Sequence, residues 1–290
     1  MLVKVKDILD KANEGGYAVG AFNTVNLETT QAILEAADEM KSPVIIQITE
    51  KTMNYAGGRA IFNIVKNIAE FYCEEVPFGI HLDHGKSFEI IERAVEIGMT
   101  SVMYDGSRKK YSDNLMMTKK ISEFCKEKGV NLQAELGNVP YMKETGLKEI
   151  NWDEYMTDPS QAEEFVKETG IDALAVAVGN AHDFAKERPE PDFERLADIN
   201  NRLQMPLIMH GASDWEAKNV KKAVENGINC FNVDTASRIA FISSLSKTVG
   251  CGSGAVSYDI REHLGKARDA VRETVKKKIE IFGSDGKVIN

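Results

Sequence analysis

Short apolar runs and amphipathic segments alternate along almost the whole chain. Eight runs rich in β-branched residues predict buried strands, at residues 17–22, 44–48, 78–82, 101–104, 131–135, 173–178, 207–209 and 230–233. Segments with helical periodicity lie between them, for example at residues 27–40, 88–97, 113–128 and 159–168. Glycines that commonly follow the last turn of a helix precede several of the strands. These are Gly98, Gly129, Gly170 and Gly227.

Repeated β-α units in a chain of 290 residues favour one α/β domain, residues 1–290, folded as a closed parallel (β/α)8 TIM barrel. An open doubly wound sheet would normally carry a glycine-rich dinucleotide turn after its first strand, and Gly20-Ala21-Phe22-Asn23 is no such turn. Two helical stretches, residues 236–247 and 258–282, follow the last strand. They are expected to pack outside the barrel as additional C-terminal helices.

Charge and composition exclude several classes of function. A net charge of −9 without a basic face argues against nucleic acid as a partner. No stretch approaches the roughly 18 apolar residues of a membrane span, and the first residues are charged too early for a secretory signal. The four cysteines contain no C-x-x-C pair and fit buried thiols in a reducing cytoplasm. They are Cys73, Cys125, Cys230 and Cys251.

Histidines gather where the predicted strands end. His81 and His84 follow the third run, His182 the sixth and His210 the seventh. One histidine at a strand end is often structural, but three strands that each deliver one to the same barrel face are a less likely coincidence. Three imidazoles around one point form an open zinc site with a position for water or substrate.

Carboxylates lie on the same rim. Asp83 ends the third strand, Asp105 follows the fourth, Glu135 ends the fifth and Asp234 ends the eighth. A buried carboxylate is costly unless it binds a metal, accepts hydrogen bonds or acts as an acid or base. Each of these residues could also orient a histidine.

The loops after the seventh and eighth strands have the features of a phosphate site. Residues 210–214 offer small side chains, backbone amides and a hydroxyl, and residues 232–237 offer an amide, a hydroxyl and the start of a helix. Gly-Ala-Ser is also an ordinary turn. Two long segments, 137–156 and 183–193, are expected on the same face.

Taken together, these residues resemble the zinc-dependent class II ketose-bisphosphate aldolases over nearly the whole chain. The matching motifs are His-Leu-Asp-His-Gly at 81–85, Ser-Val-Met-Tyr-Asp-Gly-Ser at 101–107, Ala-Glu-Leu-Gly at 134–137, Tyr-Met-Thr-Asp-Pro at 155–159, Ala-Leu-Ala-Val-Ala-Val-Gly-Asn-Ala-His at 173–182, His-Gly-Ala-Ser at 210–213 and Asn-Val-Asp-Thr at 232–235. The motif at 210–214 is closer to the tagatose-bisphosphate branch, and the motif at 232–235 to the fructose-bisphosphate branch.

The resemblance implies a role for each matching residue. His84, His182 and His210 would hold the catalytic zinc, Asp105 and Glu135 a second divalent metal. Asp83 would be the acid/base residue at the C4 hydroxyl, and Asn232 would stabilise the enediolate. The residues implied in substrate binding are Asn23, Thr49, Asp183, Gly211, Ala212, Ser213, Asn232, Val233, Asp234 and Thr235. A monovalent cation, Na⁺ or K⁺, often assists the family near the phosphate.

Three departures from the family pattern concern the substrate more than the metal. Asp183 stands where glycine usually follows the metal-binding histidine. The segment 138–146 lacks the usual Gly-Gly-x-Glu, and Glu144 could replace its acid. The basic residue expected soon after His182 is displaced, with Lys186 and Arg188 as candidates.

The resemblance implies zinc-dependent, reversible aldol cleavage of a phosphorylated ketose, such as fructose or tagatose 1,6-bisphosphate, to dihydroxyacetone phosphate and an aldehyde. A metal-dependent hydrolase and a barrel that keeps the metal site without turnover, or with an altered substrate, are the alternatives. The expected partners are a small sugar phosphate and further copies of the chain, as a homodimer or homotetramer in the cytoplasm.

Overall fold

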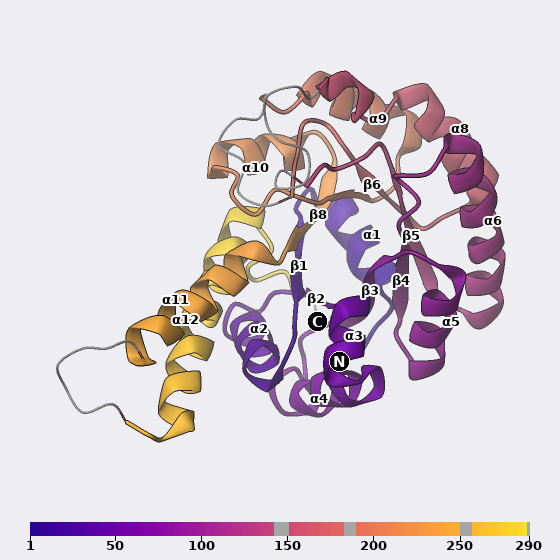
Figure 1. Ribbon diagram of the computed structural model, residues 1–290. Helices are drawn as coiled ribbons and strands as arrows, with labels where there is room; N and C mark the ends of the chain where they lie inside the picture. Colours follow the sequence, from indigo (N-terminus) through magenta and orange to yellow (C-terminus); the bar gives the residue numbers. More distant parts are fainter. Residues whose placement is uncertain (142–150, 183–189, 250–256, 289–290) are drawn as a thin grey trace.

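Parallel strands close into a barrel in the computed structural model, which describes residues 1–141, 151–182, 190–249 and 257–288 (Figure 1). Neighbours in sequence are neighbours in the sheet, and β1 closes the ring against β8. The strands are β1 (Val19–Asn23), β2 (Val44–Thr49), β3 (Phe78–Gly85), β4 (Ser101–Tyr104), β5 (Asn131–Leu136), β6 (Ala173–Val176), β7 (Leu207–Met209) and β8 (Ile228–Val233). The predicted closed (β/α)8 barrel with additional C-terminal helices is confirmed.

Helices surround this barrel and cover its outer face (Figure 1). The described helices are α1 (Val5–Gly15), α2 (Leu27–Glu39), α3 (Glu50–Ala56), α4 (Gly58–Tyr72), α5 (Phe88–Ile97), α6 (Tyr111–Lys128), the 3-10 helix η1 (Trp152–Glu154), α8 (Pro159–Thr169), α9 (Phe193–Leu203), α10 (Ala217–Glu225), α11 (Thr235–Val249) and α12 (Ile260–Phe282). Among the residues described, none of these helices has the length and apolar character needed to cross a bilayer.

Local sequence explains where the helices begin. The Asn26 side chain accepts a hydrogen bond from the backbone of Thr29, whose own side chain closes the reciprocal half of a capping box. The Ser87 side chain caps α5 by accepting from the backbone N–H of Ile90, and Asp158 caps α8 directly before Pro159, a residue suited to the first helical position. The chain therefore enters α2 and α5 within a few residues of leaving β1 and β3.

The apolar core has two parts. The larger one fills the space between the strands and the surrounding helices. The smaller one lies inside the barrel, where Val5, Ile8 and Leu9 of α1 pack among inward-facing side chains such as Ile45 and Ile208. Helix α1 thereby closes one end of the barrel (Figure 1) and leaves the C-terminal ends of the strands free to form a site.

The last two helices leave the barrel as a pair. The C-terminal half of α12 packs against α2, where Arg272 and Lys276 form ion pairs with Glu35 and Glu39. Helix α11 and the start of α12 extend beyond the ring of strands (Figure 1), and Ser237 is the one buried residue of α11 within the described part of the chain. The expectation that these helices pack outside the barrel therefore holds for α12 more than for α11.

Candidate active site

A cavity of ≈ 910 Å³ opens at the C-terminal ends of the strands. Its walls come from the strand ends and the residues that directly follow them, because parallel strands in a barrel point the same way. The described residues that line it are Asn23, Val25, Thr49, Glu50, Lys51, Thr52, Asn54, Tyr55, Asp83, His84, Lys86, Tyr141, Ala181, His182, His210, Gly211, Ser213, Asn232, Asp234, Thr235 and Arg238. Most of the residues that the sequence singled out are therefore brought together in one place.

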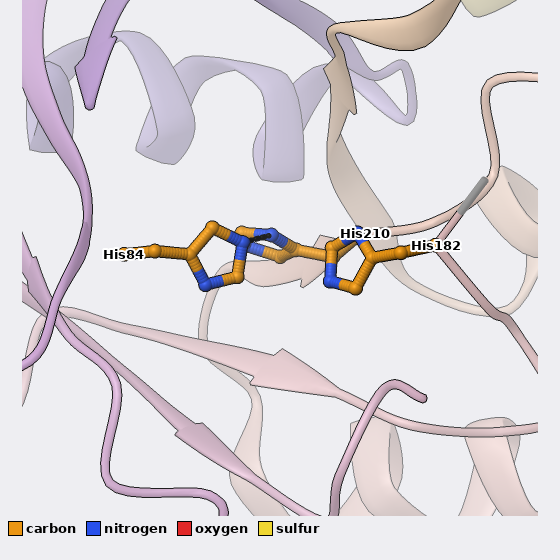
Figure 2. A group of neighbouring side chains, drawn as sticks. All are labelled: His84, His182 and His210. Carbon is orange, nitrogen blue, oxygen red and sulfur yellow. Dashed lines mark hydrogen bonds between the residues drawn. The ribbon is translucent and has the colours of Figure 1, made fainter. Parts of the chain in front are cut away.

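Three imidazoles from three parts of the chain meet in this cavity. His84 lies in β3, His182 follows β6 and His210 directly follows β7. Their nearest ring nitrogens all lie within 4.8 Å of one another, and Nδ1 of His210 is 3.0 Å from Nε2 of His84. Figure 2 shows the three rings directed toward one another. Three convergent imidazole nitrogens are the ligand set of an open zinc site, so these residues fit the ion.

His84 reaches the cavity through an irregularity in β3. Alternation along a strand would place it on the opposite face from Asp83. The pairing of β3 with β4 shifts register between Leu82 and Gly85, and His84 has a φ of 50°. This bulge turns the imidazole inward next to Asp83, and positive φ in a non-glycine residue is often found at functional sites. His81 instead lies buried with Nδ1 2.8 Å from the hydroxyl of Ser101.

The three histidines differ in their readiness to bind a cation. Burial and the nearby His84 lower the pKa of His182 to about 3, and the same two causes hold the pKa of His210 well below its usual range. Burial also opposes the charge of His84, but attraction to Asp83 and the hydrogen bond with Asp105 outweigh it and raise its pKa to about 9. Two of the rings are therefore neutral and able to coordinate at neutral pH.

Asp83 lies between two side-chain amides. Nδ2 of Asn23 donates to one carboxylate oxygen at 2.8 Å, and Nδ2 of Asn232 lies 3.4 Å from the other. The carboxylate is buried, yet it borders the cavity. Nε2 of His84 is 3.8 Å away. Asp83 is thus fixed in orientation next to the histidines, with its charge facing the space that a ligand would fill.

A second group of possible ligands lies behind His84. Atoms of Asp105, Glu135 and His84 lie within 4.8 Å of one another. Oε2 of Glu135 is buried and has no hydrogen-bond partner among the described residues, and burial followed by the charge of Asp105 raises the pKa of this carboxyl to about 8. A buried carboxylate oxygen without a partner fits a cation at this position.

The loops after β7 and β8 form another part of the cavity wall. Gly211 has a φ of 62°, and a Cβ there would lie 2.5 Å from the backbone of Ala181, so the turn requires glycine. Gly211 and Ser213 line the cavity together with Asp234 and Thr235, and Thr235 begins α11. The start of a helix with its free amides favours an anion.

Three of the predicted substrate residues stand apart from this set. The side chains of Ala212 and Val233 are buried in the apolar core, so that contact with a ligand would come from their backbone. Asp183 lies outside the described residues, as do Glu144, Lys186 and Arg188. Asn23 and Thr49, by contrast, lie on the cavity wall at the ends of β1 and β2.

Known proteins are similar to this chain in sequence and in fold. A family model described as "Fructose-bisphosphate aldolase class-II" matches residues 3–287. The chain belongs to this family. It is a class II aldolase, a carbon–carbon lyase. A fructose-bisphosphate aldolase of Thermus caldophilus is 41% identical over 99% of this chain and 100% of that protein. The crystal structure of the YdjI aldolase from Escherichia coli K12 is 31% identical, with a TM-score of 0.88 over 100% of both chains.

The aldolase cavity and its immediate surroundings also contain residues that the sequence interpretation missed. Lys51 and Lys86 line it where α3 begins and β3 ends, and Lys86 directly follows the His-Leu-Asp-His-Gly motif. Gln133 lies in β5, two positions before Glu135 and therefore on the same face, with Nε2 3.0 Å from Nε2 of His210. The ring of Tyr141 lies against that of His182. Strand alternation could have indicated Gln133; no local pattern indicated the place of Tyr141.

Proposed function

We propose that this class II aldolase reversibly cleaves a ketose 1,6-bisphosphate of the fructose or tagatose type into dihydroxyacetone phosphate and an aldehyde, with zinc held by His84, His182 and His210. The observation that carries this proposal is the convergence of the three imidazoles beside Asp83 in one cavity. The similarity to fructose-bisphosphate aldolases such as that of Geobacillus stearothermophilus, 39% identical over 99% of this chain, supports the choice of substrate.

The charges along the cavity support a substrate with phosphate at both ends. The loops after β7 and β8 would bind the phosphate of the dihydroxyacetone part. Lys51 and Lys86 lie at the ends of β2 and β3, and in a closed ring of eight strands β3 is opposite β7. Two ammonium groups there would attract the anionic end of the aldehyde part. A ketose bound between these walls would place its central carbons near Asp83.

The chain's own residues would carry the proton and orient the sugar. A zinc ion, when bound, would act as a Lewis acid on the substrate ketone. The Asp83 carboxylate would take the proton of the C4 hydroxyl as the C3–C4 bond breaks and return it in condensation. The Asn23 amide holds Asp83 in place at 2.8 Å, and the Asn232 amide is positioned to donate to negative charge that develops on a substrate oxygen.

Other ions and further copies of the chain complete the proposal. Asp105 and Glu135 would hold a second divalent metal, and a monovalent cation, Na⁺ or K⁺, would bind near the phosphate. We also propose a homodimer or homotetramer that contacts through the exposed apolar side chains of α11 and the start of α12, such as Ile242 and Ile260. The three described cysteines are free thiols, which supports a cytoplasmic location.

Removal of the metal tests the proposed function. Chelation should abolish release of triose phosphate from both bisphosphates, and zinc should restore it, because the three histidines alone do not polarise the ketone. His84→Ala should lose bound zinc and cleavage together. Full activity after verified removal of the metal would contradict the zinc mechanism. Bound zinc with hydrolysis of an ester or amide, and no cleavage of any ketose phosphate, would favour a hydrolase instead.

A further inference from the structure

The three imidazoles of the proposed metal centre are held in different ways. Nδ1 of His84 lies 3.0 Å from the Asp105 carboxylate, and Nε2 of His210 lies 3.0 Å from the Gln133 amide. Within the described part of the chain, the ring of His182 makes no hydrogen bond. A metal-binding imidazole usually has its other nitrogen fixed by a carboxylate, a carbonyl or water. His182 therefore needs support of another kind.

That support comes from an aromatic ring. Tyr141 lies flat against His182, with the ring centroids 4.2 Å apart and the ring planes 17° from parallel. This geometry is that of a stacked pair, which attracts beyond the burial of its area. The stack covers one face of the imidazole and restricts its rotation, while Tyr141 itself borders the cavity.

Tyr141 is fixed to the same backbone that carries His182. The two residues form a parallel β-bridge, and the backbone N–H of His182 donates to the carbonyl of Pro140 at 2.9 Å. The guanidinium of Arg108 lies 5.3 Å from the centroid of the Tyr141 ring, in the range of a cation–π contact. The ring is thus held by its own backbone and by a cation from the segment after β4.

We propose that Tyr141 is a positioning residue, whose ring fixes the orientation of His182 for metal binding in place of the usual hydrogen bond. The role rests on the proposed zinc site. It goes beyond that site because it assigns a role to Tyr141 in the segment after β5, which supports the proposed ligand His182 after β6. The ring of Tyr141, and not its hydroxyl, restricts the imidazole, since the contact is between the two rings.

Measurements of metal affinity distinguish a contribution of the Tyr141 ring from a contribution of its hydroxyl. Tyr141→Leu removes the aromatic face, Tyr141→Phe only the hydroxyl. We expect Tyr141→Leu to weaken Zn²⁺ binding about ten-fold, the loss typical when the support of a metal-binding histidine is removed. Competition with a chromophoric chelator measures this without substrate. With Co²⁺ in place of Zn²⁺, the visible spectrum should change in Tyr141→Leu and stay as in wild type in Tyr141→Phe, because only the former alters ligand geometry.

A matched control excludes a general effect of losing a tyrosine. Tyr111→Leu on α6 removes a ring that packs against Phe165, away from the cavity, and should leave Zn²⁺ affinity and the Co²⁺ spectrum unchanged. In steady-state assays Tyr141→Leu should lower kcat more than it raises KM, because ligand geometry matters most in the transition state. Wild-type affinity and spectrum in Tyr141→Leu, or equal losses in Tyr141→Phe, would overturn the proposal.

A second measurement covers the case in which Tyr141→Leu does not fold. Ring protons of His182, assigned in NMR spectra by comparison with His182→Gln, should be shifted upfield by the stacked ring in wild type and in Tyr141→Phe. An unshifted resonance would show that the stack is absent in solution and would overturn the proposal. Failure of the proposed function has a different signature, since wild type itself would then bind no zinc or cleave no ketose phosphate.

Discussion

At the scale of single residues, Asp83 allows the proposed proton transfer to be tested separately from the proposed metal binding. Its carboxylate is held by the amides of Asn23 and Asn232 and is not part of the three-imidazole group. Asp83→Asn keeps the shape but removes the proposed base, so kcat should fall by about 10²–10⁴-fold. Bound zinc should remain equal to that of wild type. Assays of triose phosphate release and metal content check both; loss of zinc along with activity would instead place Asp83 among the ligands.

The thiols offer a test of burial that is independent of catalysis. Burial raises the pKa of Cys73 and of Cys125 to about 12, and it raises the pKa of Cys230 further. Only the thiolate reacts with a disulfide reagent. In a Cys251→Ser background, which removes the one cysteine outside the described residues, native protein at mildly alkaline pH should react very slowly. After denaturation all three thiols should react, and rapid labelling of the native protein would contradict their burial.

Residue identity indicated the candidate metal ligands more readily than it indicated their geometry. The position of histidines at strand ends indicated His84, His182 and His210 because a parallel barrel brings those ends together. The sequence could not show that a bulge and a φ of 50° turn His84 toward Asp83, since alternation along β3 predicts the opposite face. Nor could it show the stacking of Tyr141 on His182, because that contact joins two loops through tertiary packing.

At the scale of elements, the turn after β7 depends on its glycine. A Cβ on Gly211 would meet the carbonyl group of Ala181 at 2.5 Å, so Gly211→Ala should displace the segment that carries His182 or the loop that carries Ser213. Because a shift of about 1 Å can cost two orders of magnitude in rate, kcat/KM should fall about 100-fold.

Gly265→Ala is the matched control for this change. Nothing lies within 4 Å of a Cβ at Gly265, which is inside α12. Alanine there should leave kinetics unchanged and stabilise the fold by roughly 0.5–1 kcal/mol, measured by denaturant unfolding. Wild-type kcat/KM in Gly211→Ala would mean that the turn can relax and is not needed to position the phosphate.

Element boundaries followed from sequence where apolar pattern and turn signals agree. The strands predicted at 101–104 and 207–209 and the helix at 88–97 agree with the structure. The strand predicted at 78–82 continues to Gly85, because the polar residues His81, Asp83 and His84 interrupt its apolar pattern while the backbone pairing persists. Helix α1 was not predicted, since it covers the end of the barrel and its role depends on the closed ring.

At the scale of the whole molecule, α11 and the start of α12 are less buried than the rest of the fold. Large apolar side chains on them are exposed, at 58% for Ile242, 97% for Tyr258 and 70% for Ile260. Exposed apolar patches of this kind often mark a contact between proteins. A two-fold axis through the helix pair would bury the same patch on two copies at once.

Mass in solution tests that assembly. Light scattering should give two or four times the chain mass of 32.2 kDa. Ile242→Glu should shift the protein toward lower mass, because a buried contact would then place like charges against each other across the axis. Met116→Glu is the control, since Met116 is 66% exposed on α6, a helix across the barrel from α11 (Figure 1), and should leave the mass unchanged. A monomeric wild type would contradict the proposed assembly, and an oligomer that Ile242→Glu leaves intact would place the contact elsewhere. Retained zinc binding in a monomeric Ile242→Glu would show that each copy builds its metal centre alone.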